Sequence, residues 1–460
     1  MKKVNNFFIL LSYFFLGITA LTNVASALFN KNMVHLSIEQ LISIGIWTSL
    51  PWSAKILFSS VIDAVPIIGN QRKSYLVLAS ILGIAASLGM AESALPNSWL
   101  FIHLGEYTTL LLTNLFGTIS VVITRLLFDV LIVENAIDEQ EKASFQLYSR
   151  NLMIAGGLVG AAISGILASY FSIATIFMLS TISPLVILII SISNTYKKSN
   201  EASDKSLIGI GVLFLLISTI LGLFLSDVWS QILVFLMSVL LFSYLLYKKV
   251  PHLENSHKLG FFITMLALFL FRTNPSAGIA ATWYYMDIWH FDAAFLGTLS
   301  TIGYAASILS MVLFRNFLVK KEKLIKILVW TTLGLLILSL PDLMIYYGYN
   351  FGISAKHLIL LDSAGVDALA QIAMIPLGII VALNAPEEGK VTYFALTASL
   401  MNAALMLSSI ITKFLNHIFV VPRGHYENLG LLLVWSLIIS VGLSIIGIII
   451  LKFTEKGSLK

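Results

Sequence analysis

Long apolar runs are the feature of this sequence that most limits what it can fold into. A helix needs roughly 20 apolar residues to cross the hydrocarbon core of a bilayer. Runs of about that length or longer follow one another along the 460 residues, at 7–29, 38–63, 74–93, 99–133, 147–169, 171–193, 207–226, 229–247, 259–286, 294–315, 324–346, 362–384, 391–416 and 429–452. Charged residues make up only 11% of the chain and the mean hydropathy is +0.93, which a soluble core of this size would not need. The sequence therefore predicts an all-α integral membrane protein with about 14 transmembrane helices.

The runs divide into groups of six, two and six. The polar stretch 194–205 separates the first six from the two that follow. We therefore expect a six-helix bundle at 1–194, a linker with two extra transmembrane helices at 195–257, and a second six-helix bundle at 258–460. One run, 99–133, is long for a single crossing, and a tilted helix is the simplest account of its length.

Basic residues indicate on which side of the membrane the loops lie, because lysine and arginine are enriched in cytoplasmic loops. With Met1 placed inside, 20 of the 28 basic residues fall in cytoplasmic loops, and only Lys31, Lys356 and Arg423 fall in outside loops. No clear small-residue cleavage site follows the first run, so we interpret it as a membrane helix rather than a removable signal peptide. We expect a multi-pass protein of a cell membrane, most simply a bacterial inner membrane, with both termini in the cytoplasm.

Several classes of function are disfavoured by the composition and the motifs. The net charge of +5 comes from basic residues in loops between spans, which indicates topology rather than nucleic-acid binding. The sequence has no cysteine, its eight histidines show no metal-ligand spacing, and it has no nucleophile elbow, zinc-protease helix or phosphate-binding glycine loop. We therefore predict no cofactor, no metal site and no enzyme activity. The alternatives are a membrane-embedded enzyme and an inactive sensor. Either would be indicated if the protein moved no solute across a membrane.

The two groups of six enter the membrane in the same orientation, because two helices lie between them. Parallel halves related by an axis along the membrane normal are the arrangement of the major facilitator carriers. We therefore expect a solute cavity between the halves that opens to one side of the membrane at a time.

A short loop between the second and third runs has the most specific motif. Its residues are Pro51-Trp52, Lys55, Asp63, Pro66-Ile67, Gly69, Arg72 and Tyr75. Asp63 can cap a helix or pair with Arg72, and Gly69 allows the chain to reverse direction. The motif resembles the signature of the folate-biopterin transporter family of the major facilitator superfamily.

Other segments extend this resemblance over most of residues 36–416. They are Phe128-Asp129 through Glu134, Gln146 with the small residues of 156–165, Arg272 through Ser276, Tyr284-Tyr285, Phe295 through Gly297, Pro386, and Thr392 through Asn402. The resemblance implies a monomeric secondary transporter that moves an anionic pteridine such as folate or biopterin, with proton coupling as a hypothesis. The family usually has acids where this chain has Arg125 and Lys390. These two changes favour a second candidate, a carrier or exporter for another small organic anion or a drug.

Arg272 is the strongest candidate for contact with the substrate. A charge within a span is costly unless it faces a cavity or a partner, and Arg272 lies near the middle of the run 259–286. The neighbouring Asn274-Pro275 pair should weaken the helix there. A guanidinium at this depth can clamp a carboxylate with two parallel hydrogen bonds, with Asn274 beside it. The alternative is a structural ion pair with an acid on a facing helix.

A second group of charges lies in the first half. Arg125 and Asp129 are four residues apart, so they can pair with each other on one helix face. Asp129 can instead be a proton-linked carboxylate, and Asp63 shares that assignment. Lys55 can reach the cavity or extend to the cytoplasmic surface. We expect Arg125 or Lys55 to assist Arg272 in neutralising the substrate.

The remaining candidates lie near the ends of the predicted spans. Glu106 and Asp367 are expected toward the outer ends of their runs, where they either accept hydrogen bonds from a pterin ring or simply line the outer vestibule. Arg150 is expected to pair with Asp63 or Glu134 in a cytoplasmic gate, to which we also assign Arg72.

Aromatic residues cluster at 283–285 and at Trp289. Most of them are expected at the membrane interface, because the span ends there. Tyr284 or Tyr285 is alternatively placed to stack on the flat heterocycle of a substrate. Small residues from Ala155 to Gly165 predict a close approach between helices.

Overall fold

In the computed structural model of the chain, every regular element among the described residues is a helix. It describes residues 6–64, 67, 70–135, 137, 139–194, 196, 205–224, 228–249, 255–318, 324–349, 352–383 and 390–457. The helices are α1 (Asn6–Ile18), η1 (Thr19–Thr22), α2 (Asn23–Asn32), α3 (Ile38–Ser53), α4 (Lys55–Ala64), α5 (Gln71–Ser93), α6 (Trp99–Leu104), α7 (Glu106–Asn135), α8 (Glu139–Tyr170), α9 (Ile173–Leu179), α10 (Ile182–Ser193), α11 (Lys205–Phe224), α12 (Val228–Lys249), α13 (Asn255–Arg272), α14 (Gly278–Ile288), α15 (Ala293–Leu318), α16 (Leu324–Leu338), α17 (Leu340–Tyr347), α18 (Ala355–Leu383), α19 (Lys390–Phe419) and α20 (Leu429–Gly457).

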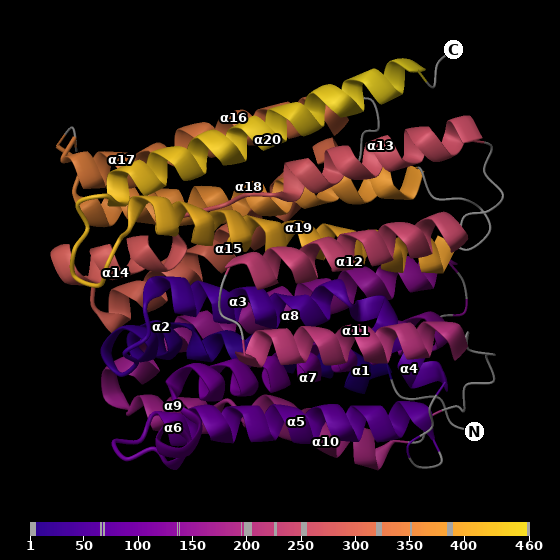
Figure 1. Cartoon of the computed structure of the whole chain (residues 1–460), viewed down its shortest axis with the longest axis horizontal. Coiled ribbons are helices and arrows are strands. Elements are labelled where there is room, and N and C mark those ends of the chain that lie inside the picture. Colours follow the sequence, from indigo (N-terminus) through magenta and orange to yellow (C-terminus); the bar gives the residue numbers. More distant parts are fainter. Residues whose placement is uncertain are drawn as a thin grey trace. The chain divides into compact units, whose positions relative to one another are not determined.

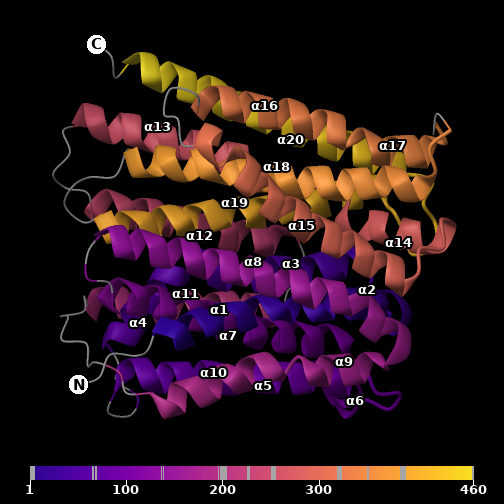
Figure 2. The same ribbon diagram turned by 180° about the vertical axis from the view of Figure 1, so that it is seen from behind.

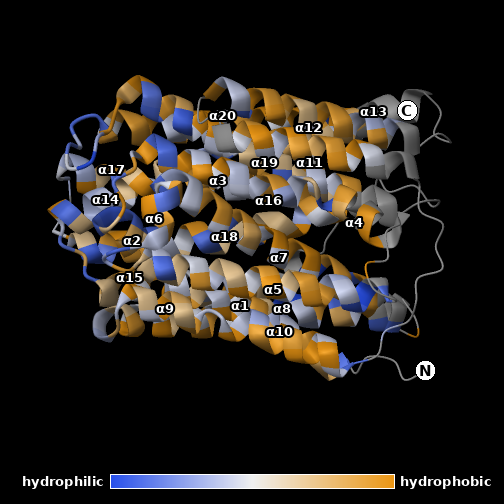
Figure 3. Ribbon diagram, turned by 60° about the horizontal axis from the view of Figure 1, so that its bottom comes forward, coloured by the Kyte–Doolittle hydropathy of each residue, from blue (hydrophilic) through white to orange (hydrophobic). Residues whose placement is uncertain are grey.

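These helices confirm the prediction of an all-α membrane protein. Within the described residues, 11 helical stretches are long and apolar enough to cross a bilayer. The remaining predicted spans correspond to the helix pair α3 and α4, to α11, and to the pair α13 and α14. Large apolar side chains on the helices are exposed, for example Leu240 at 69% and Val312 at 68%. Figure 3 accordingly colours long parts of most helices as hydrophobic, as expected for surfaces that face lipid.

The run 99–133 is not one continuous helix, and the tilt of its long helix stays a prediction. The run contains two helices, α6 and α7, separated by Gly105 with a φ of +78°. Ser98 caps α6 by accepting a hydrogen bond from the Phe101 N–H at 3.0 Å. A glycine adopts this left-handed φ without strain, so the chain turns there and the spanning helix begins at Glu106.

Contacts divide the chain into two compact units. Unit 1 comprises residues 1–36, 54–226 and 291–304, and unit 2 comprises residues 37–53, 227–290 and 305–460. The boundaries near residues 194 and 258, which were predicted to separate the two six-helix bundles from the linker, stay a prediction.

Unit 1 is held together by closely packed helices. In it α5 lies beside α7 and α10, and α1 packs along α8 (Figure 1). The approach of α1 to α8 requires glycine, because a Cβ on Gly17 would lie 1.9 Å from the carbonyl oxygen of Met153, and one on Gly156 would lie 2.1 Å from that of Phe14. Tyr13 and Phe128 are among the buried residues of the core that these helices enclose.

Unit 2 is organised around α19. This helix packs against α3, α12 and α13, while α20 packs against α13 and α16. Figure 2 shows α16 followed end to end by α17, and both helices contact α18 and α20. The contact between α3 and α19 is fixed at both ends, since Asn402 Nδ2 donates to the Trp52 carbonyl at 3.1 Å and His417 Nδ1 lies 3.6 Å from Glu39 Oε1.

Candidate functional site

The helix break between α13 and α14 positions the strongest candidate residue. Helix α13 ends at Arg272, residues 273–277 are not helical, and α14 begins at Gly278. Proline has no N–H and disfavours helical backbone in the residue before it, so the Asn274-Pro275 pair interrupts the helix. The predicted weakening of the helix at this point is confirmed.

Hydroxyl groups of two neighbouring helices satisfy the backbone of the break. The Asn274 N–H donates to Ser408 Oγ at 2.8 Å, and the Ser276 N–H donates to Thr412 Oγ1 at 3.2 Å. The Ser440 hydroxyl donates to the Pro275 carbonyl at 2.8 Å. We refer to these three hydroxyls as the hydroxyl brace. It supplies hydrogen bonds that the interrupted helix cannot make in a medium without water.

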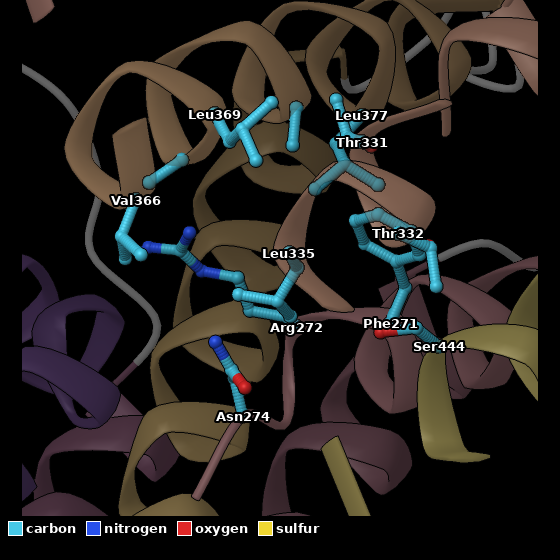
Figure 4. Close-up of a pocket in the computed structure, with 12 residues that line it drawn as sticks. Phe271, Arg272, Asn274, Thr331, Thr332, Leu335, Val366, Leu369, Leu377 and Ser444 are labelled. Atoms are coloured by element: carbon cyan, nitrogen blue, oxygen red, sulfur yellow. The ribbon is translucent and has the colours of Figure 1, made fainter. Parts of the chain in front are cut away.

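Arg272 and Asn274 line a pocket of about 100 Å³ within unit 2. The other lining residues come from α13, α16, α18 and α20: Phe271, Thr331, Thr332, Leu335, Val366, Leu369, Ala370, Ala373, Leu377 and Ser444. Figure 4 shows the Arg272 side chain extending toward Val366 of α18. Sites for drug-sized ligands enclose roughly 300 Å³ or more. This pocket therefore presents a guanidinium in mostly apolar surroundings, but it is too small for a whole pteridine in this conformation.

The aromatic residues of α14 are buried in unit 2, and their expected position at the membrane interface stays a prediction. Trp283 is 1% exposed, Tyr284 8% and Tyr285 7%. The Tyr285 hydroxyl donates a hydrogen bond to Asp342 Oδ1 of α17. The Tyr284 ring packs against the rings of Tyr346 and Tyr426, with centroids 5.7 and 5.5 Å apart. The rings that could stack on a heterocycle are thus already in contact with protein side chains.

The loop between α19 and α20 fastens these aromatic residues. Tyr346 donates from its hydroxyl to the carbonyl oxygens of Tyr426 and Glu427, at 3.0 and 2.5 Å. The Tyr426 hydroxyl donates to Asp287 Oδ2 at the end of α14. Burial, together with the Asp287 carboxylate, raises the pKa of Tyr426 well above its usual value, so this phenol stays protonated and donates.

In unit 1 the carboxylate of Asp129 connects three helices. Its Oδ2 lies 2.8 Å from Lys55 Nζ at the start of α4, and its Oδ1 accepts a hydrogen bond of 2.5 Å from the Tyr13 hydroxyl of α1. The Lys55 side chain is 20% exposed and that of Asp129 is 44% exposed. The sequence left open whether Asp129 pairs locally with Arg125 or serves as a proton-linked carboxylate, and in the structure Asp129 contacts Lys55 and Tyr13.

Tyr13 is a residue that the sequence reasoning missed. A phenol hydroxyl within an apolar run needs a hydrogen-bond partner, and that requirement was the available signal. Asp342, Asp362 and Lys413 were missed in the same way. Asp362 lies within electrostatic range of Asp342 and Asp367, and the buried Lys413 donates to Gln231 Oε1 of α12 at 3.1 Å.

The two acids expected near outer helix ends occupy different positions along their helices. Glu106 is the first residue of α7, and its carboxylate oxygens lie 2.7 Å from the His35 backbone nitrogen and 2.8 Å from His35 Nδ1. Asp367, by contrast, lies near the middle of α18, because that helix begins at Ala355 rather than near residue 362. The expected outer position is wrong for Asp367. Its backbone carbonyl accepts a hydrogen bond from Ser307 at 3.4 Å.

The proposed cytoplasmic gate is only partly visible. Arg72 is 7% exposed at the start of α5, and Arg150 of α8 lies within electrostatic range of Arg125. The side chains of Asp63 and Glu134 lie outside the described residues. The pairing of Arg150 with either acid therefore stays a prediction.

Solved structures with the same architecture are membrane transporters. A POT family transporter in complex with 5-aminolevulinic acid matches with a TM-score of 0.71 at 13% identity, over 98% of this chain and 96% of that chain. The xylose transporter XylE from E. coli, in an inward open conformation, matches with a TM-score of 0.58 at 14% identity, over 95% and 94% of the two chains. The fold is therefore of the major facilitator type, as the sequence predicted.

Curated relatives cover most of the chain. It is 27% identical to the folate-biopterin transporter of Synechocystis sp., over 93% of this chain and 77% of that protein. It is 25% identical to the probable folate-biopterin transporter 4 of Arabidopsis thaliana, over 82% and 81%, and 20% identical to folate transporter 1 of Plasmodium falciparum, over 91% and 74%. The model of the BT1 family matches residues 16–456, nearly the whole sequence. This protein, a membrane transporter and not an enzyme, belongs to the BT1 family.

Proposed function

We propose that this transporter moves pteridines, above all the anion folate and also biopterin, across a cell membrane by secondary active transport with alternating access. The observation that carries the proposal is the position of Arg272 beside a helix break, in a pocket, in the middle of a predicted span. A guanidinium matches the planar geometry of a carboxylate and is retained at bilayer depth only where a partner or a cavity offsets its cost. The relatives are named folate-biopterin transporters, which supports pteridines as the substrate class.

In this proposal Arg272 clamps a substrate carboxylate, and Asn274 adds an amide beside it. Lys55 and Arg125 of unit 1 supply further positive charge, while Tyr284, Tyr285, Glu106 and Asp367 hold the heterocycle. The aromatic pair is buried and the pocket beside Arg272 is small, so binding of a whole pteridine requires a conformation in which α14 has moved away from its present contacts. Broken helices suit such a movement, because only a few backbone hydrogen bonds must be exchanged.

The driving force and the topology belong to the same proposal. Asp129 and Asp63 are the candidates for coupling transport to protons, and Arg72, Arg150 and Glu134 are the candidates for a cytoplasmic gate. We place both termini in the cytoplasm of a bacterial cell and expect the transporter to act as a monomer. Uptake that is indifferent to an imposed proton gradient would remove the coupling hypothesis.

The alternative is a carrier or exporter for another small organic anion or a drug. It is favoured by the two basic residues, Arg125 and Lys390, at positions where the family resemblance leads us to expect acids. Competition separates the two candidates, because an exporter of unrelated drugs would not be inhibited by excess unlabelled biopterin.

Uptake of labelled folate into proteoliposomes tests the proposal. The wild-type protein should take up folate above the level of empty liposomes, and Arg272→Ala should lower uptake by about 100-fold, the typical effect of removing one partner of a charge pair that is desolvated on binding. Arg272→Lys should recover part of the activity, since it restores the charge without the forked geometry. The control is Lys326→Ala, which removes a cation from an exposed position on α16 of the same unit. Equal uptake by wild type and Arg272→Ala would reject the clamp.

A further inference from the structure

The ion pair between Lys55 and Asp129 joins a cation to a group that is chemically the same as a substrate carboxylate. Asp129 Oδ2 is 2.8 Å from the Lys55 ammonium, and Asp129 Oδ1 accepts a 2.5 Å hydrogen bond from Tyr13. The carboxylate is therefore held at both oxygens, by side chains of α4 and α1. A free carboxylate ligand would offer Lys55 the same pair of oxygens.

The pair is accessible enough for such an exchange. The side chains of Lys55 and Asp129 are 20% and 44% exposed, whereas Tyr13 is buried, with 2% exposed. Ion pairs with this degree of exposure contribute little stability, so separating them costs little. Lysine suits the exchange, because its ammonium carries three donors on a flexible stem and can change acceptors without losing its charge.

A displaced Asp129 would remain in favourable surroundings. Tyr13 still donates to it from the core of unit 1, and Arg125 lies four residues earlier on α7. The charge of Arg125 also reaches the Tyr13 hydroxyl. The carboxylate can therefore release Lys55 without becoming an unpaired charge.

We propose that Asp129 is an internal competitor of the substrate: its carboxylate occupies Lys55 in the unloaded transporter, a carboxylate of the substrate displaces it, and Tyr13 is the positioning residue that holds Asp129 in place. The proposal deepens the proposed function, since it rests on an anionic substrate. Lys55 then provides the affinity for anions. Asp129, held in place by Tyr13, lowers that affinity by competing for Lys55.

The proposal predicts effects that depend on the charge of the ligand. Asp129→Asn keeps the size of the side chain but removes the competing charge, so the KM for folate should fall by about three- to five-fold, the range expected for a partly exposed ion pair. The KM for an uncharged pterin, such as 6-hydroxymethylpterin, should stay the same. Tyr13→Phe should change the KM for folate in the same direction by about two-fold, because it loosens Asp129 without removing it.

Lys55 provides the internal check. Lys55→Ala should raise the KM for folate and should abolish the benefit of Asp129→Asn when the two are combined. Lys55→Arg keeps the positive charge and should retain most of the wild-type affinity for folate. If the pair were merely structural, its variants would change the KM for charged and uncharged ligands alike. The matched control is Asp292→Asn, which neutralises an acid of unit 1 whose Oδ1 accepts from the Phe295 N–H at 2.8 Å.

The experiment combines uptake of folate and 6-hydroxymethylpterin with equilibrium binding of both ligands and of glutamate, a simple carboxylate, to the purified full-length protein. Tighter binding of folate or glutamate by Asp129→Asn, with no change for the uncharged pterin, supports the exchange. Equal effects on charged and uncharged ligands, or no gain for any carboxylate, overturns it. A wild type that does not transport folate, together with an Asp129→Asn variant that gains affinity for glutamate, would reject folate as the substrate and still support the exchange.

Discussion

Lys55 in unit 1 and Arg272 in unit 2 are two cations in the membrane-spanning part of the chain with different surroundings. Lys55 begins α4 and forms an ion pair with Asp129, whose second oxygen is held by Tyr13. Arg272 ends α13 beside a break whose backbone is satisfied by the hydroxyl brace, and it lines a pocket. The comparison teaches that a cation in a spanning segment can be accommodated in two ways: against an acid of a neighbouring helix, or beside an interruption of a helix at a pocket.

Exchanging the charges of the unit 1 pair should have the largest effect. Lys55→Glu and Asp129→Lys each place like charges side by side, and each should destabilise the protein by about 2 kcal/mol or more. The double variant restores an ion pair and should recover most of the stability, but not the uptake of folate, because the cation is then on the wrong helix. Thermal unfolding followed by fluorescence size-exclusion chromatography measures the first effect. A double variant no more stable than either single variant would show that repulsion between like charges at these two positions is not what destabilises the single variants.

Removing the hydroxyl brace should have an intermediate effect in unit 2. Ser408→Ala combined with Ser440→Ala deletes two of the three hydroxyls, each worth about 0.6 kcal/mol and at most about 1.7 kcal/mol in a membrane protein. We expect a lower unfolding temperature and folate uptake reduced several-fold, because Arg272 is no longer held in register. The adjacent Ser409→Ala removes a hydroxyl whose hydrogen bond stays within its own helix, to the Leu405 carbonyl, and should leave both quantities unchanged. Equal effects of the Ser409 and brace variants would mean that the brace has no special role.

The smallest effect is expected outside the spans, at Tyr426. Tyr426→Phe should lower stability by about 1 kcal/mol, the typical net contribution of one hydrogen bond. The folded-state pKa of Tyr426 is raised, so its hydrogen bond to Asp287 is fully present below the unfolded pKa of about 10 and is lost only as the pH rises through the folded value. The difference between wild type and variant should therefore be the same at pH 6 and pH 8.5. A difference that disappears between these two values would contradict the assignment of Tyr426 as a protonated donor.

The sequence predicted the helices well because lipid imposes a simple rule on them. An apolar run of sufficient length has to be helical, and the proline at position 275 broke the helix beside Arg272 as expected. The errors concern the exact residues at which helices begin and the chain turns, which depend on backbone geometry. A hydropathy pattern does not show that Gly105 turns the chain, or that α18 begins early enough to carry Asp367 to mid-helix.

Side-chain partners were harder to predict than the residues themselves. Asp129 was recognised as a functional candidate, but the four-residue spacing favoured Arg125 as its partner. The actual partners, Lys55 and Tyr13, are distant in sequence and are brought to Asp129 by the packing of α1, α4 and α7. Likewise the sequence did not show that Tyr426, in the loop between α19 and α20, contacts the ring of Tyr284 and the carboxylate of Asp287.

Binding of a charged and an uncharged pteridine to one conservative variant tests the central claim most directly. Equilibrium titration of purified wild type and Arg272→Gln with folate and with 6-hydroxymethylpterin separates recognition of charge from recognition of the ring. We predict that Arg272→Gln weakens folate binding by about 30-fold or more, as expected when a charged hydrogen-bond partner is removed, and changes binding of the uncharged pterin by less than about three-fold. Unchanged folate binding, or an equal loss for both ligands, would contradict the assignment of Arg272 as the group that recognises the substrate carboxylate.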